Sequence, residues 1–284
     1  MHLSTTFRNN RMSIEKDVKD SDMGKVVRPI FLQKEGHMFD HTAETSNASV
    51  FFFKYKNLIY ACTCKHVIED IKPELESVYL RKGNMTQILG YIDCDPLSPI
   101  PNKGFHIAPS VDVAFLYIKD GRMLDYIKSE YIILDFDAPI HNTADISEFY
   151  AFGWGNDHKK EVGDTVKTPQ ICCTLPASKD GSCDELNFHV ELDEEHNMSL
   201  SGMSGGLVMG RLRNSDKLVP MAIIHQGAPT KIGSSIKEDT FLNQPNAIHL
   251  YCYKISPDFL RDSLCNYDIS VINKESCFEL FSIE

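Results

Sequence analysis

A serine enclosed by glycines leads directly into an apolar, β-type segment at residues 201–209, which read Ser-Gly-Met-Ser-Gly-Gly-Leu-Val-Met. Glycine reaches backbone conformations that are closed to other residues, so the pattern predicts a tight turn followed by a buried strand. Such a turn would present the Ser204 hydroxyl, and the amides of Gly202 and Ser204 would point into one small space beside it, as an oxyanion hole requires. The alternative is a glycine-rich β-turn whose serine makes only a local hydrogen bond.

A nucleophilic serine needs a base, and the base needs a group that orients it. His66 follows the mostly apolar run 57–64, which is typical of a buried strand, so we expect its ring at a strand end, facing a cleft. Asp112 is the single carboxylate near the start of the β-rich run 110–118, where a charge is costly unless it is paired. Alone, each residue has an ordinary interpretation as a strand-end histidine or a turn aspartate. Together with Ser204 they form an ordered set that favours a shared catalytic role.

This set resembles the triad of the trypsin/chymotrypsin superfamily of serine peptidases, in which histidine, aspartate and serine follow in this order. The intervals of 46 and 92 residues between His66, Asp112 and Ser204 suit a triad divided between two β-barrels. Four short segments resemble the histidine segment, the aspartate strand, the opening strand of the second barrel and the nucleophile loop of that family: 64–67, 111–116, 152–156 and 202–206. The resemblance covers residues 25 to 262 and is specific in combination, although each segment is weak alone.

The resemblance implies an all-β fold of two antiparallel six-stranded β-barrels with a short C-terminal helix. We expect a flexible N-terminal extension at 1–24, which could also act as a docking or autoinhibitory arm. The first barrel, with His66 and Asp112, would span 25–140, and the second, with Ser204, would span 141–255. The C-terminal helix and tail would occupy 256–284. The implied activity is that of a serine endopeptidase that works through an acyl-enzyme and needs no cofactor.

Local patterns place several elements. The run 48–55, the turn at Lys56 and Asn57, and the following apolar run predict a β-hairpin. The segment 121–137 departs from the alternating pattern, and its residues Met123, Tyr126, Ile127 and Tyr131 fit a short helix before a strand at 131–134. At 256–264 the sequence predicts a helix with Ser256 as its N-cap and Pro257 as its first residue. The tail from Cys265 onward is interpreted as one more packed strand or a partner contact.

Substrate selectivity is predicted from the apolar strand at 218–227, whose equivalent in the family lines the pocket for the residue before the scissile bond (P1). Glutamyl endopeptidases, and viral cysteine relatives that cut after glutamine, place a histidine in this strand. The resemblance therefore assigns substrate binding to His225, Gly227 and Ser199 and a Glu or Gln preference at P1. The alternative for His225 is an ordinary strand histidine with satisfied hydrogen bonds.

The chain departs from animal members of the family just before the nucleophile. Those proteins carry an aspartate there, which binds the new N-terminal amine after zymogen cleavage, whereas this chain has Met203. That activation switch is therefore not expected. The chain is more similar to the bacterial, HtrA-like and glutamyl-endopeptidase-like branches, which do not use the switch.

Cysteine usage bears on metal binding and on the compartment. Cys62, Cys64 and His66 would share one face of an extended strand, so a zinc site is conceivable, but no second ligand cluster accompanies them and we expect no metal. An odd number of cysteines, nine, with several in apolar runs, is typical of reduced cytosolic thiols rather than a disulfide framework. No signal-peptide core or membrane span is evident, so a cytoplasmic protein is expected.

The charge balance bears on partners. With 29 basic and 40 acidic residues, the formal net charge of −11 disfavours nucleic acid and anionic membranes as partners. The expected partner is a protein or peptide substrate. A peptidase in the cytoplasm must be restrained, which favours an activating or regulatory protein and a role in a bacterial stress or defence system. The rival interpretation is a catalytically silent trypsin-like module for binding or scaffolding.

Overall fold

The structure is a computed structural model, and it describes a set of ranges within the chain. They are 25–34, 47–69, 75–82, 85–91, 106–118, 121–138, 140–154, 160–162, 165–167, 170–175, 185–191, 202–213, 215, 217–229, 247–267 and 280–282. The predicted N-terminal extension at 1–24 and the predicted substrate-binding residue Ser199 lie outside the described residues.

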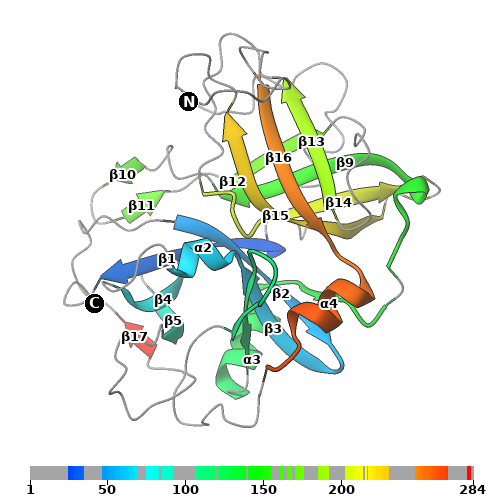
Figure 1. Cartoon of the computed structure of the whole chain (residues 1–284). Helices are drawn as coiled ribbons and strands as arrows, with labels where there is room; N and C mark the ends of the chain where they lie inside the picture. Colours follow the sequence, from blue (N-terminus) through cyan, green and yellow to red (C-terminus); the bar gives the residue numbers. More distant parts are fainter. Residues whose placement is uncertain are drawn as a thin grey trace.

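The N-terminal half forms a nine-stranded sheet with the order β17-β5-β4-β1-β2-β3-β7-β6, and β8 pairs with β2 beside this path (Figure 1). Its strands are β1 (Val27–Lys34), β2 (Asn47–Tyr55), β3 (Leu58–Thr63), β4 (Leu75–Lys82), β5 (Met85–Tyr91), β6 (His106–Ile107), β7 (Ala114–Tyr117), β8 (Ile133–Asp135) and the C-terminal β17 (Leu280–Ser282). Among the described residues, the helices α2 (Lys65–Glu69) and α3 (Gly121–Glu130) accompany them. All pairs are antiparallel except β2 with β8, which is parallel.

The second half forms a six-stranded antiparallel sheet with the order β12-β9-β14-β15-β16-β13. Its strands are β9 (Ile146–Trp154), β12 (Gln170–Leu175), β13 (Glu185–Glu191), β14 (Leu207–Leu212), β15 (Leu218–Pro229) and β16 (Ala247–Lys254). A short 3-10 turn, η3 (Thr143–Asp145), precedes it, and β10 (Lys160–Val162) and β11 (Thr165–Lys167) form a separate small hairpin. The predicted barrel boundary at residue 140 falls between β8 and β9.

Three apolar cores explain how the two sheets stack. One core lies within each sheet, and the third joins residues of both sheets, including Phe51 and Phe53 from β2 with Phe152 from β9. Successive residues of a strand point to opposite faces, so Phe52 enters the core within the first sheet while Phe51 and Phe53 enter the shared core. Burial on both faces accounts for the unbroken apolar run at 50–53.

The helix α4 (Pro257–Ser263) closes the fold beside the junction of the two sheets (Figure 1). The Ser256 hydroxyl accepts a hydrogen bond from the Phe259 amide at 3.0 Å, which confirms the predicted N-cap. Leu260 of α4 is fully buried in the core shared by the two sheets. These features confirm the expected all-β, chymotrypsin-like fold with a short C-terminal helix, although the first sheet holds nine strands rather than six.

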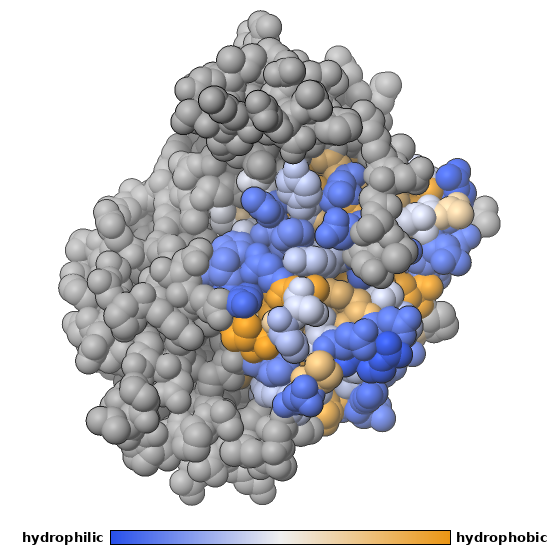
Figure 2. All heavy atoms as spheres, in the orientation of Figure 1, coloured by the Kyte–Doolittle hydropathy of each residue, from blue (hydrophilic) through white to orange (hydrophobic). Residues whose placement is uncertain are grey.

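No helix within the described ranges has the length and apolar character needed to cross a membrane. On the face shown in Figure 2, hydrophilic side chains of the described residues are interspersed with smaller apolar areas.

Candidate active site

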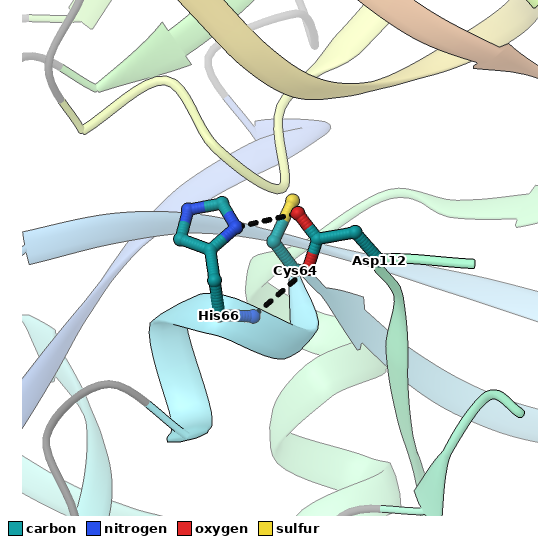
Figure 3. Close-up of side chains that lie close together, drawn as sticks. All are labelled: Cys64, His66 and Asp112. Atoms are coloured by element: carbon teal, nitrogen blue, oxygen red, sulfur yellow. Dashed lines mark hydrogen bonds and ion pairs between the residues drawn. The ribbon is translucent and has the colours of Figure 1, made fainter. Parts of the chain in front are cut away.

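His66 lies in the first turn of α2 rather than at the strand end where the sequence places it, because β3 ends at Thr63 and the chain then turns into the helix. The first amides of a helix have no carbonyl partner within it. The His66 amide instead donates to Asp112 Oδ1 at 2.9 Å, and the ring Nδ1 lies 2.6 Å from Asp112 Oδ2 (Figure 3). Both carboxylate oxygens therefore bind the same residue, which fixes the imidazole relative to the helix.

Asp112 lies just before β7, and its own amide donates to the Tyr253 hydroxyl at 3.2 Å. Burial of the carboxyl group opposes its ionisation, but the two hydrogen bonds from His66 outweigh this effect and hold the pKa of Asp112 below its ordinary value. The group is thus an anionic acceptor at neutral pH. It accepts a hydrogen bond from the Nδ1–H of His66, and this tautomer leaves the lone pair of Nε2 on the opposite side of the ring.

Ser204 completes the arrangement on that other side. Its Oγ lies 3.0 Å from Nε2 of His66, although the two residues are 138 positions apart in the chain. Because Nε2 is the accepting nitrogen in this tautomer, the Ser204 hydroxyl donates. The side chains of His66 and Asp112 are 37% and 28% exposed, so a ligand can reach the site from solvent.

Glycines allow the loop that carries Ser204 to press against both sheets. Gly202 and Gly205 have φ angles of 92° and 82°, in the left-handed region that glycine adopts readily. A Cβ atom at Gly205 would lie 2.2 Å from the carbonyl oxygen of Ser49, and one at Gly206 would lie 2.3 Å from that of Phe152. No side chain fits at either position, which explains in steric terms why two glycines follow the serine.

The predicted oxyanion-hole donors are the amides of Gly202 and Ser204. Met203 accepts a hydrogen bond at its carbonyl from the Gly206 amide at 2.7 Å. Since the C=O and N–H of a trans peptide point in opposite directions, this bond directs the Ser204 amide away from the loop interior. Among the described residues, neither predicted donor has a hydrogen-bond partner. The oxyanion role of both amides stays a prediction.

Met203 stands at the position where the sequence resemblance would place the aspartate of animal trypsin-like peptidases, and its environment is apolar. It is buried in the core of the second sheet, against Gly153, where an added Cβ would lie 2.9 Å from the Met203 Cγ. This pocket has the size and polarity for a thioether, and a carboxylate placed there would need a charged partner. Packing of Met203 therefore anchors the loop directly before the serine.

The geometry contradicts the premise of the zinc interpretation, that Cys62, Cys64 and His66 share one face. Cys62 points into the core between the sheets and Cys64 into the core of the first sheet, because the extended strand ends before the residues could share a face. Cys64, His66 and Asp112 do have ligand atoms within 4.8 Å of one another (Figure 3). In this arrangement Nδ1 of His66 and Oδ2 of Asp112 lie 2.6 Å apart and are hydrogen-bonded to each other.

Cys64 is better described as a packing residue behind the carboxylate. It is fully buried, and its thiol donates to the carbonyl of Ile224 at 3.3 Å. Burial raises the pKa of the Cys64 thiol well above its ordinary value, so it stays protonated beside the anionic Asp112. The cysteine thus packs behind the Asp112 carboxylate as an uncharged, buried side chain.

His225, predicted to bind substrate, lies on β15 close to the same group. Its ring stacks on Tyr253 with centroids 4.1 Å apart, and Tyr253 in turn accepts the hydrogen bond from Asp112. The Nε2 atom of His225 is buried and has no hydrogen-bond partner among the described residues. Gly227, two residues further along β15, is exposed. Their roles in substrate binding stay predictions.

The sequence analysis did not predict two residues near the site, Tyr253 and Ser49. Tyr253 gave no local signal, because its contact with Asp112 joins segments 141 residues apart. Ser49 did give one, since it is a polar residue inside an apolar strand, and buried polar groups are normally hydrogen-bonded. Its hydroxyl contacts the nucleophile loop at the Gly202 carbonyl.

Together the fold and this constellation define a class: a chymotrypsin-like, two-sheet protein with serine, histidine and aspartate in one hydrogen-bonded row. No protein-family model matches the sequence, and no curated protein matches it. Among solved structures, the chain is similar to a thermostable serine protease, AL20, from an extremophilic microorganism, with 11% identity over 86% of this chain and 97% of that one and a TM-score of 0.47. It is also similar to the protease Anisep from Arthrobacter nicotinovorans, with 10% identity over 84% and 94% of the two chains and a TM-score of 0.45. At these identities and TM-scores, neither the site residues nor the substrates of those proteases are carried over to this chain.

Proposed function

We propose that the chain is a serine endopeptidase in which Ser204 is the nucleophile, His66 the general base and Asp112 the group that orients the base. One observation carries the proposal, the unbroken row from Asp112 Oδ2 through the imidazole to Ser204 Oγ, with contacts of 2.6 and 3.0 Å. Hydrogen-bond reach between a nucleophile and its base, with a third group holding the base, is the general signature of an activated hydroxyl.

In this mechanism Ser204 Oγ attacks the peptide carbonyl carbon while its proton passes to Nε2 of His66. Asp112 stabilises the resulting imidazolium, and the amides of Gly202 and Ser204 bind the tetrahedral oxyanion. Collapse breaks the C–N bond, and His66 gives its proton to the leaving amine. Water then attacks the acyl-enzyme with His66 again as the base, which releases the acid and restores the Ser204 hydroxyl.

A polar P1 residue, Glu or Gln, is the proposed specificity. The buried Nε2 of His225 supports it, because this atom has no hydrogen-bond partner among the described residues, and a buried polar atom without a partner is costly until a ligand supplies one. Burial lowers the pKa of His225, an effect that Asp112 and Glu185 partly oppose and His66 reinforces. A neutral imidazole pairs well with an uncharged amide, so Gln is expected to be favoured over Glu at neutral and alkaline pH.

Conditional, intracellular activity is also proposed. Among the described residues, Cys62, Cys64, Cys173 and Cys252 are buried thiols outside any disulfide, which supports a reducing compartment. The buried Met203, in place of an aspartate, supports an activation route other than capture of a new N-terminal amine. Adding candidate regulatory proteins to the purified chain and following turnover tests this part.

The pH dependence of P1 preference tests the role of His225. Because the folded pKa of His225 is lowered, the ring is neutral at pH 8 and gains its proton only as the pH falls below its ordinary value of 6.5. The ratio of kcat/KM for a Glu substrate to that for the matched Gln substrate should therefore rise as the pH falls from about 8 to about 5.5. Taking a ratio removes any effect of pH that both substrates share.

The matched variant is His225→Gln, which keeps a polar side chain and removes the titration, so its ratio should be nearly flat over the same range. A peptide library provides the P1 profile in the same experiment. Dominant cleavage after Arg or Lys, or a flat ratio in the unmodified protein, would refute the proposed role of His225.

A further inference from the structure

Ser49 on β2 makes four hydrogen bonds around the nucleophile loop although it belongs to the other sheet. Its amide donates to the Ser204 carbonyl at 2.9 Å, and its hydroxyl donates to the Gly202 carbonyl at 3.0 Å. The same hydroxyl oxygen accepts from the Trp154 amide at 2.9 Å, and the Ser49 carbonyl accepts from the Thr63 hydroxyl at 2.8 Å. Ser49 is fully buried, so water does not compete for these bonds.

These contacts hold the carbonyl groups of three consecutive residues. Ser49 binds those of Gly202 and Ser204, and the Gly206 amide binds that of Met203 between them. Because each peptide unit is planar, fixing a carbonyl also fixes the N–H on the same unit. The direction of the Ser204 amide and the position of its side chain both depend on this set of bonds.

The hydroxyl of Ser49 binds the loop at a glycine. Gly202 has a φ angle of 92° and no side chain, so no side-chain packing of its own restrains the backbone there. The Ser49 amide would still bind Ser204 if the hydroxyl were lost. However, the Gly202 carbonyl and the Trp154 amide, at the end of β9, would both lose their partner within the described structure.

We propose that Ser49 is a positioning residue, whose hydroxyl fixes the Gly202–Met203 peptide, the unit that links the two predicted oxyanion-hole amides, and thereby sets the geometry of the hole beside Ser204. The inference rests on the proposed peptidase function. It gives β2 of the first sheet a part in positioning the loop that carries Ser204 on the second sheet. Ser49 itself touches no reacting atom and acts through the loop.

A purely structural role would lower stability and leave the chemistry intact, so the test separates the two. Ser49→Ala should lower kcat about 10- to 100-fold, as expected for a small misplacement of catalytic groups, and change KM less than about 3-fold. Ser49→Thr retains a hydroxyl and should recover most of kcat. Ser147→Ala is the matched control, since that serine also donates to a strand carbonyl, at Arg211, on an exposed part of β9.

Trp154 provides a readout that does not depend on activity. It is the single tryptophan of the chain, its indole N–H donates to the Val27 carbonyl at 2.9 Å, and its backbone amide binds Ser49 Oγ. The fluorescence emission maximum of Trp154 should therefore shift in Ser49→Ala and stay unchanged in Ser147→Ala. Thermal unfolding of each variant shows whether it is folded at the assay temperature.

The outcomes are distinct. Reduced kcat with nearly constant KM, recovered by Thr, supports the inference, whereas full kcat in a folded Ser49→Ala variant overturns it. If Ser49→Ala does not fold, Ser49→Thr and Ser49→Val are compared, because their side chains have the same shape and differ in the hydroxyl. Equal kcat in that pair also overturns the inference. An unmodified protein that neither cleaves peptides nor reacts with a fluorophosphonate refutes the peptidase function itself, and the inference falls with it.

Discussion

Replacing Ser204 with alanine is expected to lower kcat/KM for peptide hydrolysis by about 10⁴-fold or more. The change removes the oxygen that forms the acyl-enzyme and that lies 3.0 Å from Nε2 of His66. The fold should remain intact, because the Ser204 contacts that hold the loop are made by its backbone and persist in alanine. Steady-state kinetics on a peptide substrate and thermal unfolding provide the two measurements.

The matched control for this variant is Ser215→Ala. Ser215 is an exposed serine in the turn between β14 and β15, and its hydroxyl accepts a hydrogen bond from the nearby Lys217 amide, away from the triad residues. That variant should retain the turnover and the melting temperature of the unmodified protein. Undiminished cleavage by Ser204→Ala would refute the assignment of the nucleophile.

Replacing Asp112 with asparagine should lower kcat by about 10⁴-fold near neutral pH, the loss seen for the equivalent change in the well-studied triad. The physical reason is the tautomer of His66. Asp112 accepts the Nδ1 proton at 2.6 Å, whereas an amide can present its NH₂ group there and draw the proton to Nε2 instead. The imidazole could then no longer accept the proton of Ser204.

The pH dependence of stability checks the same contact. The pKa of Asp112 is lowered in the folded protein, so its contribution to stability is present above the ordinary value of 3.8 and is lost as the pH falls below it. The difference in unfolding free energy between the unmodified protein and Asp112→Asn should therefore shrink as the pH falls below about 4. Asp258→Asn, which alters an exposed carboxylate on α4, is the control and should keep full activity. Full activity in Asp112→Asn would contradict the proposed role of the carboxylate.

Elements with local signals were predictable from the sequence. Lys56 and Asn57 both have positive φ angles, 49° and 60°, which is the two-residue turn that joins β2 to β3 in the expected hairpin. The N-cap at Ser256 and the short helix before β8 were also correctly placed, because capping and helical spacing depend on residues close in sequence. The proximity of His66, Asp112 and Ser204 was likewise expected, because each lies in a short recognisable segment.

Contacts between distant segments were not predictable in the same way. The parallel pairing of β8 with β2 and the pairing of β17 with β5 join segments that are far apart in the chain, and neither strand carries a pattern that names its partner. Cys62, Cys64 and His66 were expected on one face, but the start of α2 after β3 breaks the alternation on which that expectation rested. Ser49 could be noted as a polar residue within an apolar run, yet its four partners come from three other segments.

The most direct test of the account is covalent labelling by a fluorophosphonate, which reacts with a serine only when a base activates it. Mass spectrometry of the digested protein should find one adduct, on Ser204, in the unmodified chain, and labelling should be lost in His66→Ala although Ser204 is retained. An adduct on another serine, labelling that persists without His66, or no labelling under any tested condition would contradict the account. The last result would favour a chymotrypsin-like module used for binding or scaffolding.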